Sequence, residues 1–593
     1  MRLFFNAVVH VFDPALPVPR TVSDLAPANA LLVGDDGKVL ASGGVEDLRA
    51  RAAELSAPAE ASGASATNPG VSALEEIDLG GRVVVPGLVD AHLHVLSYAE
   101  SLAEVDLRGT ATLEEAIAVL RAYAADLPDG MWLTGGRWDF NKWGLAQQPD
   151  RELLDAAFPD RPVALSSIDF HTLWCNGAAL RAAGVDASTA DPAGGAIVRD
   201  AHGEATGILR ETAADLVWAV VPDLPLEVRV EYLRRAQQEW LAEGLTSVHD
   251  IDGAASREAW EELRARGEQR MRVVKYLRPE ELAWAVEASW HTGGGDAWFT
   301  QGGLKLFSDG ALGSQSSHMS KAYPHAHDEP ENYGIQITTE DQLVEQITEA
   351  LAHGIAPAIH AIGDQANHHV LNAYARTAEL AEAARARTGL PLRGRIEHAQ
   401  FVQPGDVDRF RELGIIASMQ PRHCISDLHL IERLRPDEAL AAYAWTDLED
   451  SGAVVAFGSD GPVEPSNPFA AIYAAMTRAD ISGDPATSYQ RERRMSACRA
   501  WRAHSWAPAF AAGIEERAGH LGAGADADFL VLDIDPFTFR DDSGAVVGDG
   551  VSGEYASEEA LFAHAEALRD ATPVLTVVAG EVAYEREAAR AAV

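Results

Sequence analysis

Short runs of β-branched and other apolar residues alternate with long stretches rich in Ala, Leu and Glu from Gly81 onward. The runs are VVVPGLVDAH, GLTSVHD, GGLKLFSDG, APAIHAIGD, GRIEHAQF, GIIASMQ and AVVAFGSD. Strands that alternate with helices lie parallel in a sheet, because each helix serves as the crossover to the next strand. Repetition of this unit predicts an α/β fold built on a (β/α)8 TIM-like barrel.

Polar residues directly follow several of these runs, at the expected carboxyl ends of the strands. In a barrel of this kind the chemistry takes place at that end. Residue types that bind metals or transfer protons occupy these positions, namely His92, His94, Lys305, His360, His398 and Asp460. His92 and His94 are two residues apart on one strand, so both side chains point to the same face and can hold one cation.

The His-x-His pattern is weak by itself, because 20 histidines in 593 residues produce roughly 0.7 such pairs by chance. A second pair, His325 and His327, lies in the Pro-rich sequence YPHAHDEPENYG, and we interpret it as a solvated loop. Asp460 in SDGP could instead be a turn residue, and Lys305 could extend to water. The order of ligand-type residues along the chain, rather than their number, is therefore the informative feature.

Charge and composition exclude several classes of partner. The chain has 48 Lys and Arg against 90 Asp and Glu, a net charge of −42 that repels phosphate backbones and anionic lipids. The N-terminal MRLFFNAVVHVFDP is interrupted by polar residues and predicts a strand rather than a signal peptide. No CxxC pair occurs among the three cysteines, which fits a reducing compartment. We expect a cytoplasmic protein that binds a small-molecule substrate, with no nucleic acid or membrane partner and with a homodimer as a candidate assembly.

The ordered series His-x-His, Lys, His, His, Asp resembles that of the amidohydrolase superfamily. The segment VVVPGLVDAHLHV is similar to the family's first barrel strand, which carries Pro-Gly, two hydrophobic residues, Asp and His-x-His. KLFSDGALGS, HAIGD, EHAQ and GSDGPV resemble blocks of one branch, amidohydrolase family 3, which includes YtcJ-like proteins and N-substituted formamide deformylase. These blocks span Val83 to Val463.

The resemblance implies a two-metal centre. His92 and His94 would hold the first divalent metal, and His360 and His398 would hold the second, with zinc as the leading candidate. Lys305 would be carboxylated by carbon dioxide, giving an anionic carbamate that bridges both metals. Burial among cations would lower the pKa of this lysine and help that reaction.

The resemblance also implies a reaction. Asp460 would bind one metal, take a proton from the attacking hydroxide and pass it to the leaving nitrogen. A divalent metal lowers the pKa of bound water towards about 7, which suits hydrolysis of a non-peptide C–N bond in an amide, an N-substituted formamide or a cyclic amide. Two alternatives remain: a mononuclear deaminase or lactonase with Lys305 uncarboxylated, and a non-catalytic barrel that acts as a binding or assembly protein. The complete ligand series argues against the last.

Two further units are expected beside the barrel. Alternation in the first 50 residues predicts a small β-unit, and the resemblance implies that the C-terminal segment returns to it, giving a small β-sandwich domain built from both termini. The resemblance also implies an insertion after the first barrel strand, where two Gly-rich turns with paired β-branched runs predict an α+β lobe, which we expect to overhang the pocket. The predicted boundaries are 1–82 and 513–593 for the β-sandwich, 83–107 for the first barrel strand, 108–240 for the lobe and 241–512 for the remaining barrel. The segment Ala53–Ala73 is rich in Ala, Ser, Gly and Pro and predicts a flexible surface loop.

Six further polar residues are candidates for substrate binding: His171, Asn176, Asp309, Arg422, His423 and His249. His171 and Asn176 resemble a recurring feature of family 3 that faces the metals. Asp309 either orients Lys305 or contacts substrate, and His249 either lines the pocket or makes a core hydrogen bond. Arg422 and His423 either bind a substrate carbonyl or carboxylate or form an ordinary salt bridge. The lobe's tryptophans (Trp132, Trp138, Trp143 and Trp174) suit an apolar pocket or an ordinary core equally.

Overall fold

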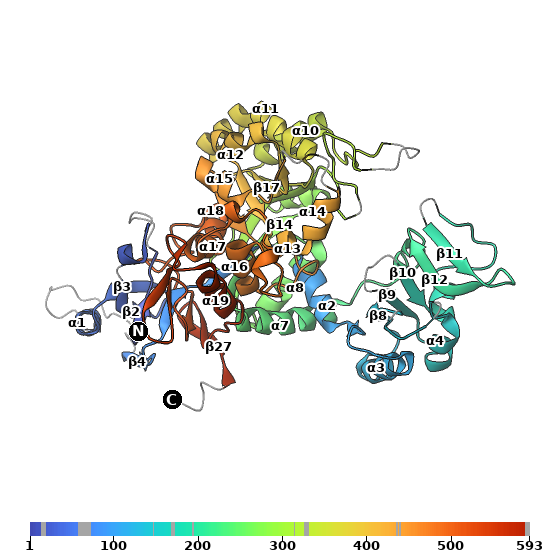
Figure 1. The fold of residues 1–593 in the computed structure, drawn as a ribbon, viewed down its shortest axis with the longest axis horizontal. Coiled ribbons are helices and arrows are strands. Elements are labelled where there is room, and N and C mark those ends of the chain that lie inside the picture. The colour runs from blue at the N-terminus through green and yellow to red at the C-terminus, as the bar shows by residue number, and fades with distance from the viewer. Residues whose placement is uncertain are drawn as a thin grey trace. The chain divides into compact units, whose positions relative to one another are not determined.

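Eight parallel strands form one sheet in the larger part of the computed structural model (Figure 1). In hydrogen-bonding order they are β21 (Val455–Phe457), β19 (Ile416–Met419), β17 (Arg395–His398), β16 (Pro357–Ala361), β15 (Phe299–Phe307), β14 (Arg272–Leu277), β13 (Leu245–Asp250) and β6 (Leu88–Leu93). Nearly all their residues are buried, because one face fills the interior and the other meets the helices. The predicted (β/α)8 barrel is confirmed.

The segment after β21 closes the barrel against β6. The backbone nitrogen of Asp460 donates to the His92 carbonyl at 2.7 Å, and the nitrogen of His94 donates to the Gly461 carbonyl at 3.1 Å. These hydrogen bonds join the two ends of the sheet where the strands end. The predicted ligand residues of the first and last barrel strands are thereby brought side by side.

A glycine and a buried carboxylate support this closure. A Cβ atom at Gly458 would lie 2.5 Å from the backbone nitrogen of His92, so only glycine permits the close approach. The Asp90 carboxylate accepts hydrogen bonds from the Ser459 backbone nitrogen at 3.0 Å and from the Ser459 hydroxyl at 2.5 Å. Both interactions depend on residues that flank the predicted ligands.

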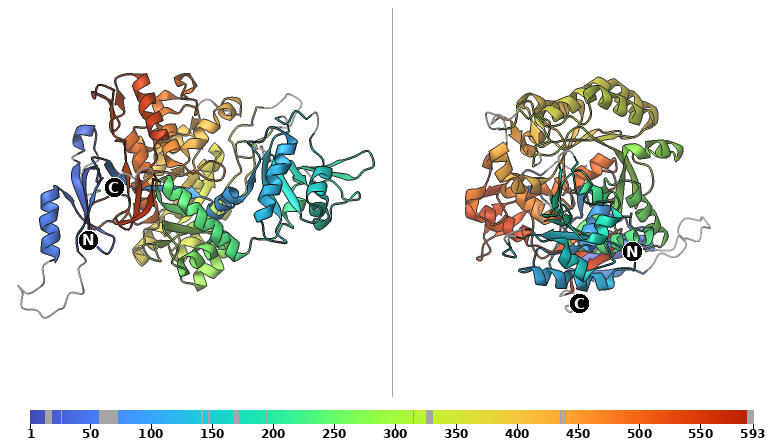
Figure 2. Two further views of the ribbon diagram at one scale, coloured as in Figure 1. Left: turned by 90° about the horizontal axis from the view of Figure 1, so that it is seen from below. Right: turned by 90° about the vertical axis from the view of Figure 1, so that its right-hand side faces the viewer.

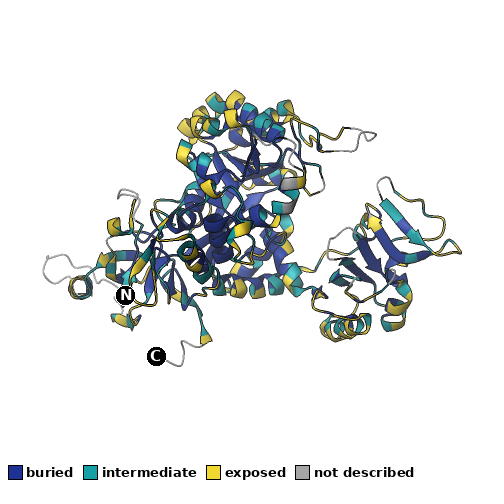
Figure 3. Ribbon diagram, in the orientation of Figure 1, coloured by how far each residue is buried: buried dark blue, intermediate teal, exposed yellow. Residues whose placement is uncertain are grey.

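Helices connect the strands and cover the outside of the barrel, and most of them have exposed residues on their outer faces (Figure 3). They include α7 (Leu226–Ala242), α8 (Ala254–Ala265), α10 (Glu340–Ala352), α11 (Asp364–Thr388), α12 (Val407–Leu413), α15 (Trp445–Ser451), α17 (Ala497–Ala503) and α18 (Trp506–Ala512). Helix α10 begins at a capping box formed by Thr339 and Gln342. Helix α11 ends at Gly389, whose φ of 69° is the left-handed conformation that ends a helix. None of the helices in the described residues combines the length and the apolar character needed to cross a membrane.

Strands from both ends of the chain form a second sheet (Figure 2). It contains β1 (Arg2–Val9), β2 (Ala28–Val33), β3 (Val39–Gly43), β4 (Glu75–Asp78), β5 (Val83–Pro86), β22 (Phe529–Leu532), β26 (Leu575–Val578) and β27 (Glu581–Glu585). Phe4 and Phe529 meet edge to face on one side, with ring centroids 5.0 Å apart. Helix α1 (Val45–Ser56) covers the other side. The predicted sandwich is thus a single continuous sheet with a core on each face.

Several boundaries differ from those expected from sequence. Strand β5 belongs to the terminal sheet, so the first barrel strand begins only at Leu88. Helix α1 extends to Ser56, so the start of the predicted flexible segment is helical. The structure describes residues 1–12, 19–25, 27–56, 73–140, 142–145, 148–167, 172–192, 195–313, 315–324, 331–434, 437 and 440–587. The rest of the predicted loop, 57–72, lies outside these residues, as do His325 and His327.

The inserted lobe forms a separate unit, Ala99–Tyr232. Its six-stranded sheet contains β7 (Val105–Asp106), β8 (Leu133–Trp138), β9 (Val163–Ser167), β10 (Thr172–Cys175), β11 (Gly195–Arg199) and β12 (Ala205–Glu211), with helices α3 (Leu113–Asp126), α4 (Arg151–Ala157) and α5 (Gly177–Ala182). Trp138, Trp143 and Trp174 are buried, with ring centroids 6.1 to 6.3 Å apart. These three tryptophans therefore form a core of the lobe.

Folding stability should depend on a histidine that is buried away from the ligand series. His504 follows α17, and its Nδ1 donates to the Val89 carbonyl of β6 at 3.1 Å. Burial lowers its pKa to about 4, whereas the unfolded chain titrates near about 6.5. Between these two pKa values only the unfolded state takes up the proton. The contribution of the neutral His504 to the free energy of unfolding is therefore complete above about pH 6.5. It is lost as the pH falls towards 4, by up to about 3 kcal/mol.

The variant His504→Gln should therefore show a weaker loss of melting temperature than the original chain when pH is lowered from 6.5 to 4. Thermal unfolding followed by circular dichroism measures this slope. The exposed His202, changed to glutamine, serves as the control and should keep the original slope. Parallel curves for His504→Gln and the original chain would contradict the assignment.

Candidate metal centre

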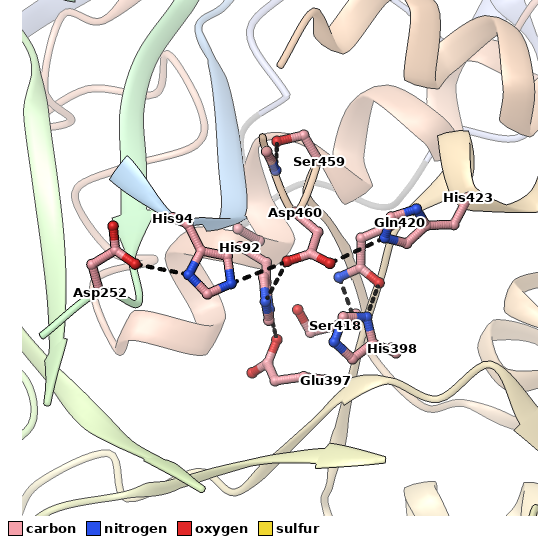
Figure 4. Close-up of polar contacts among 12 residues, drawn as sticks. His92, His94, Asp252, Glu397, His398, Ser418, Gln420, His423, Ser459 and Asp460 are labelled. Atoms are coloured by element: carbon pink, nitrogen blue, oxygen red, sulfur yellow. Dashed lines mark hydrogen bonds and ion pairs between the residues drawn. The ribbon is translucent and has the colours of Figure 1, made fainter. Parts of the chain in front are cut away.

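Two histidines and a carboxylate meet at the carboxyl-terminal face of the barrel (Figure 4). His92 lies in β6, His94 follows that strand, and Asp460 follows β21. Asp460 Oδ1 is 3.3 Å from His92 Nε2 and 3.4 Å from His94 Nε2. Ligand atoms of all three side chains lie within 4.8 Å of one another. The structure thus brings together the two ends of the predicted ligand series.

Two more histidines complete a second group around the same carboxylate. His398 is the last residue of β17, and His423 lies in α13 (Pro421–Ser426), after β19. His423 Nε2 donates to Asp460 Oδ2 at 3.2 Å. Ligand atoms of His398, His423 and Asp460 also lie within 4.8 Å of one another. Asp460 therefore turns one oxygen towards His92 and His94 and the other towards His423 (Figure 4).

The surroundings of one nitrogen atom in this cluster show whether the site suits a cation. His92 Nε2 is buried and has no hydrogen-bond partner among the described residues. An unsatisfied buried polar atom costs about 1–3 kcal/mol, and coordination of a cation would use its lone pair. Imidazole nitrogens with a carboxylate oxygen are a donor set that binds zinc and similar divalent ions. The residues present therefore fit a divalent cation.

Three candidate ligand histidines use one ring nitrogen in a hydrogen bond to a neighbouring side chain (Figure 4). The Nδ1 atom donates in each of these pairs: His92 to Glu397 at 2.5 Å, His94 to Asp252 at 2.7 Å, and His398 to Gln420 Oε1 at 2.9 Å. Metal-binding histidines usually donate their second N–H in this way, which fixes the orientation of the ring. For His92 and His94, the arrangement leaves both Nε2 atoms facing Asp460 Oδ1.

Glu397, Asp252 and Gln420 were not among the residues predicted from the sequence. Glu397 immediately precedes a predicted ligand, Asp252 follows β13 by two residues, and Gln420 directly follows β19. The sequence does show a second polar residue beside each of these strand ends, which could have indicated a supporting role. Adjacency alone does not reveal which histidine each residue contacts, because the partners come from other strands.

Carboxylates dominate the electrostatics of the cluster. Burial alone would lower the pKa of His94, but hydrogen bonds to Asp252 and Asp460 raise it to about 9. Burial alone would raise the pKa of Asp460, but the hydrogen bond from His423 and the neighbouring imidazoles of His92 and His94 hold it well below its usual range. A cation that binds here must displace the proton of His94, so cation binding should strengthen as pH rises.

The backbone is left-handed at two of the ligand-type residues. The φ angle is 73° at His398 and 61° at Asp460. Such conformations cost on the order of 1–3 kcal/mol for residues with a side chain, and they cluster at functional sites. At each position the backbone turns away from the direction of the preceding strand, and the residue at the turn is a candidate ligand.

Lys305 in β15 and His360 in β16 belong to neither of the two ligand groups in the described structure. The Lys305 side chain is buried, and its ammonium has no hydrogen-bond or ion-pair partner among the described residues; it lies 4.2 Å from the ring centre of Phe307. Burial lowers its pKa to about 8. The His360 ring centroid is 4.5 Å from that of His398, but its Nε2 donates to the Gly310 carbonyl at 3.2 Å. Burial, followed by the charge of Lys305, lowers the pKa of His360 to about 3.

Asp309 supports the loops that follow β15 and β16. Its fully buried carboxylate accepts hydrogen bonds from three backbone nitrogens, those of His318, Ile362 and Gly363, at 2.9, 3.0 and 2.8 Å. Burial raises its pKa to about 7. Its Oδ1 atom is also 3.5 Å from His360 Nε2. These contacts connect Asp309 with His360 rather than with Lys305.

His249 and Asn176 make hydrogen bonds inside their own units. His249 Nδ1 accepts a hydrogen bond from Arg395 at 3.1 Å, and the side chain is buried in the barrel, which corresponds to the core alternative. The Asn176 amide accepts from the nitrogens of Val163 and Ala179, and it donates to two carbonyls of the lobe. These four bonds occupy the amide within the lobe. His171 lies outside the described residues.

Arg422 and His423 are adjacent but differ in their contacts. Arg422 Nε donates to Glu464 Oε2 at 3.1 Å, which is the predicted salt-bridge alternative. His423 instead joins Asp460, with Glu464 Oε1 3.8 Å from its Nδ1. Burial alone would lower the pKa of His423, but Asp460 and Glu464 raise it to about 10.

Comparison with known proteins agrees with the predicted resemblance. The model of the amidohydrolase family matches residues 75–584. The putative amidohydrolase YtcJ of Bacillus subtilis (strain 168) is 33% identical over 470 residues, which cover 78% of this chain and 86% of the relative. The N-substituted formamide deformylase of Arthrobacter pascens is 28% identical over 515 residues, which cover 84% of this chain and 90% of the relative.

A solved structure is similar in fold and in sequence. The crystal structure of an uncharacterized metal-dependent hydrolase from Pyrococcus furiosus superimposes with a TM-score of 0.71 at 27% identity, covering 90% of this chain and 99% of that one. The predicted resemblance to amidohydrolases is confirmed by the family match and by these relatives. With its barrel, its ordered ligand residues and a match across most of its length, the chain belongs to the amidohydrolase family of hydrolases.

Proposed function

We propose that this protein is a metal-dependent hydrolase that cleaves a non-peptide C–N bond in a small molecule, such as an amide, an N-substituted formamide or a cyclic amide. Family membership supports hydrolysis. The similarity to a protein named N-substituted formamide deformylase supports a C–N substrate. The observation that carries the proposal is the convergence of His92, His94 and Asp460, where the buried His92 Nε2 has no hydrogen bond to any described residue.

His92, His94 and Asp460 would hold the first divalent cation, for which zinc is the candidate. When bound, such a cation supplies Lewis acidity and lowers the pKa of water towards about 7. Glu397 and Asp252 hold the two imidazole rings in place through their Nδ1 atoms. The protein thereby provides a rigid donor set whose geometry does not need to reorganise during the reaction.

Asp460 would move the proton of the reaction. Its Oδ1 atom faces the two ligand histidines, and its Oδ2 atom faces His423. We assign the proton taken from the attacking water to Oδ2, from which it passes to the leaving nitrogen. The low pKa of Asp460 keeps the carboxylate ionised at neutral pH, which is the form with a lone pair for that proton.

A second cation would be held by His360 and His398, with a carboxylated Lys305 as the bridge. The Lys305 ammonium is buried without a hydrogen-bond or ion-pair partner in the described part of the chain. Burial lowers the pKa of this amine to about 8, so a larger fraction of it is neutral at neutral pH than of an exposed lysine. The neutral amine is the form that reacts with carbon dioxide. Carboxylation would replace this amine by an anion suited to two metal ions.

A single-metal centre is the second candidate, and one observation favours it. Neither Lys305 nor His360 belongs to the ligand groups found among the described residues, and His360 Nε2 is occupied by the Gly310 carbonyl. Such a centre would suit a mononuclear deaminase or lactonase with Lys305 uncarboxylated. The two candidates differ in metal count and in the mass of the protein.

Metal content measured on protein purified without chelator tests the proposal. We expect about two divalent metal ions per chain by elemental analysis, together with a carbon dioxide adduct in the intact mass that disappears after mild acid. One metal without the adduct would support the mononuclear candidate. Absence of bound divalent metal would refute the proposed function and would favour a non-catalytic barrel.

A further inference from the structure

A charged pair lies inside the barrel, where branched apolar side chains usually fill the space. Arg395 and Glu397 are two residues apart on β17, so their side chains share a face of that strand. Arg395 is 1% exposed and Glu397 is 0% exposed. Arg395 donates to both oxygens of Glu397. The pair therefore occupies the interior of the barrel rather than its surface.

Arg395 connects its own strand to four others. Its guanidinium hydrogen-bonds to the Ala91 carbonyl of β6 at 2.6 Å, His249 Nδ1 of β13 at 3.1 Å, the Tyr276 hydroxyl of β14 at 3.0 Å and Ser418 Oγ of β19 at 2.7 Å. Together with the two oxygens of Glu397, these four acceptors give six contacts for the five N–H donors of the planar guanidinium, so that one donor on Nη2 is shared. The guanidinium therefore has little freedom to rotate, and Glu397 is held by a rigid partner.

Glu397, held by Arg395, in turn accepts a hydrogen bond from His92. Its Oε2 atom accepts from Arg395 Nη2 at 2.8 Å. The same oxygen accepts from His92 Nδ1 at 2.5 Å (Figure 4). A carboxylate in an ion pair only accepts hydrogen bonds, so the proton of the imidazole must be on Nδ1. The lone pair of His92 is then on Nε2, the nitrogen that lies 3.3 Å from Asp460 Oδ1 and has no hydrogen bond among the described residues.

We propose that Arg395 and Glu397 are positioning residues that fix the tautomer and the ring orientation of His92 for cation binding. This inference rests on the proposed function. A buried ion pair adds little stability compared with apolar side chains of the same volume, so barrel stability alone gives no reason for charges here. A requirement of His92 for a rigid hydrogen-bond acceptor would explain why the charged pair is present.

The variant Glu397→Gln tests the inference, because it keeps the shape but replaces an oxygen acceptor by an amide that can also donate. The amide can stabilise the other tautomer of His92, with the proton on Nε2. We expect zinc to bind 10- to 100-fold more weakly, the range typical for loss of a histidine's supporting carboxylate. Competition with a chromophoric chelator measures the affinity, and the visible absorption of the cobalt-loaded protein reports the ligand geometry.

Asp528→Asn is the matched control. Asp528 pairs with Arg272 through two hydrogen bonds, of 2.6 and 3.0 Å, at the beginning of β14, and ligand histidines are not among its hydrogen-bond or ion-pair partners in the described structure. This change also replaces a carboxylate by an amide beside an arginine. It should lower the melting temperature but leave zinc affinity and the cobalt spectrum as in the original chain.

The outcomes separate the inference from the function on which it rests. Weaker zinc binding and an altered cobalt spectrum in Glu397→Gln, but not in Asp528→Asn, support the inference. Equal zinc affinities in both variants and the original chain overturn it while leaving the proposed function intact. Failure of the original chain to bind zinc or cobalt refutes the function itself. If Glu397→Gln does not fold, Glu397→Asp takes its place, and an unchanged cobalt spectrum in that shortened variant overturns the inference.

Discussion

Replacement of Asp460 by asparagine is expected to lower turnover by about 10²- to 10⁴-fold while most of the bound metal remains. Asparagine keeps an oxygen that can face His92 and His94, but its amide cannot accept and release a proton at neutral pH. Steady-state rates on a panel of amides and N-substituted formamides, together with elemental analysis of the same samples, measure both effects. The loss should appear in kcat rather than mainly in KM, because the carboxylate acts in the transition state.

The control for this prediction is Asp528→Asn, the same isosteric change made beside Arg272, away from the ligand cluster. Its turnover should remain within about twofold of the original value, as is usual for substitutions remote from a site. Turnover at the original rate in Asp460→Asn, with metal still bound, would exclude the proton-transfer role. Loss of all metal in that variant would instead show that the Asp460 carboxylate is needed mainly as a ligand.

Replacement of Lys305 by alanine is expected to reduce the metal content from about two ions to one or none and to abolish the carbon dioxide adduct. The variant leaves a cavity in place of the buried side chain, next to Phe307 and in the strand neighbouring that of His360. A short carboxylic acid such as acetate or propionate can occupy this cavity and replace the lost carbamate. Partial recovery of metal content and activity at millimolar acid would therefore indicate a bridging anion.

Lys305→Met is the matched control, because its thioether chain fills the same volume and excludes the added acid. Metal content should fall as in the alanine variant, but the acid should not restore it. An unchanged metal content in both variants would contradict the bridging carbamate. It would leave the mononuclear centre as the better description.

The barrel could be predicted because the patterns of its strands and of its helices are both visible within short stretches of the sequence. Apolar runs of strand length and long helical stretches alternate in the sequence itself, and chemistry-bearing residues follow the runs at the end where barrels place them. His92, His94 and Asp460 were predicted in this way, and the structure places them together. The grouping of Lys305 and His360 with them stays a prediction, because their side chains make other contacts.

The remaining features depend on contacts between distant segments. The continuous run VVVPGLVDAH reads as one strand, but Pro86 and Gly87 divide it between the terminal sheet and the barrel. Arg395 and Glu397 read as ordinary polar residues in RIEH until the partners from other strands are known. His423 was predicted as a substrate or salt-bridge residue, and only the placement of α13 after β19 shows its contact with Asp460.

The closure of the barrel at its first and last strands also determines when the centre can exist during synthesis. Asp90 and Ser459, which join those strands, are 369 positions apart in the chain. A growing polypeptide therefore carries the histidines without the Asp460 carboxylate until the final strand has left the ribosome and packed against the first. Tight binding of metal to a partly made chain is disfavoured, because the carboxylate between the two sets of histidines arrives last. Acquisition of the cation would thus mark the completed barrel and stabilise it against reopening at that seam.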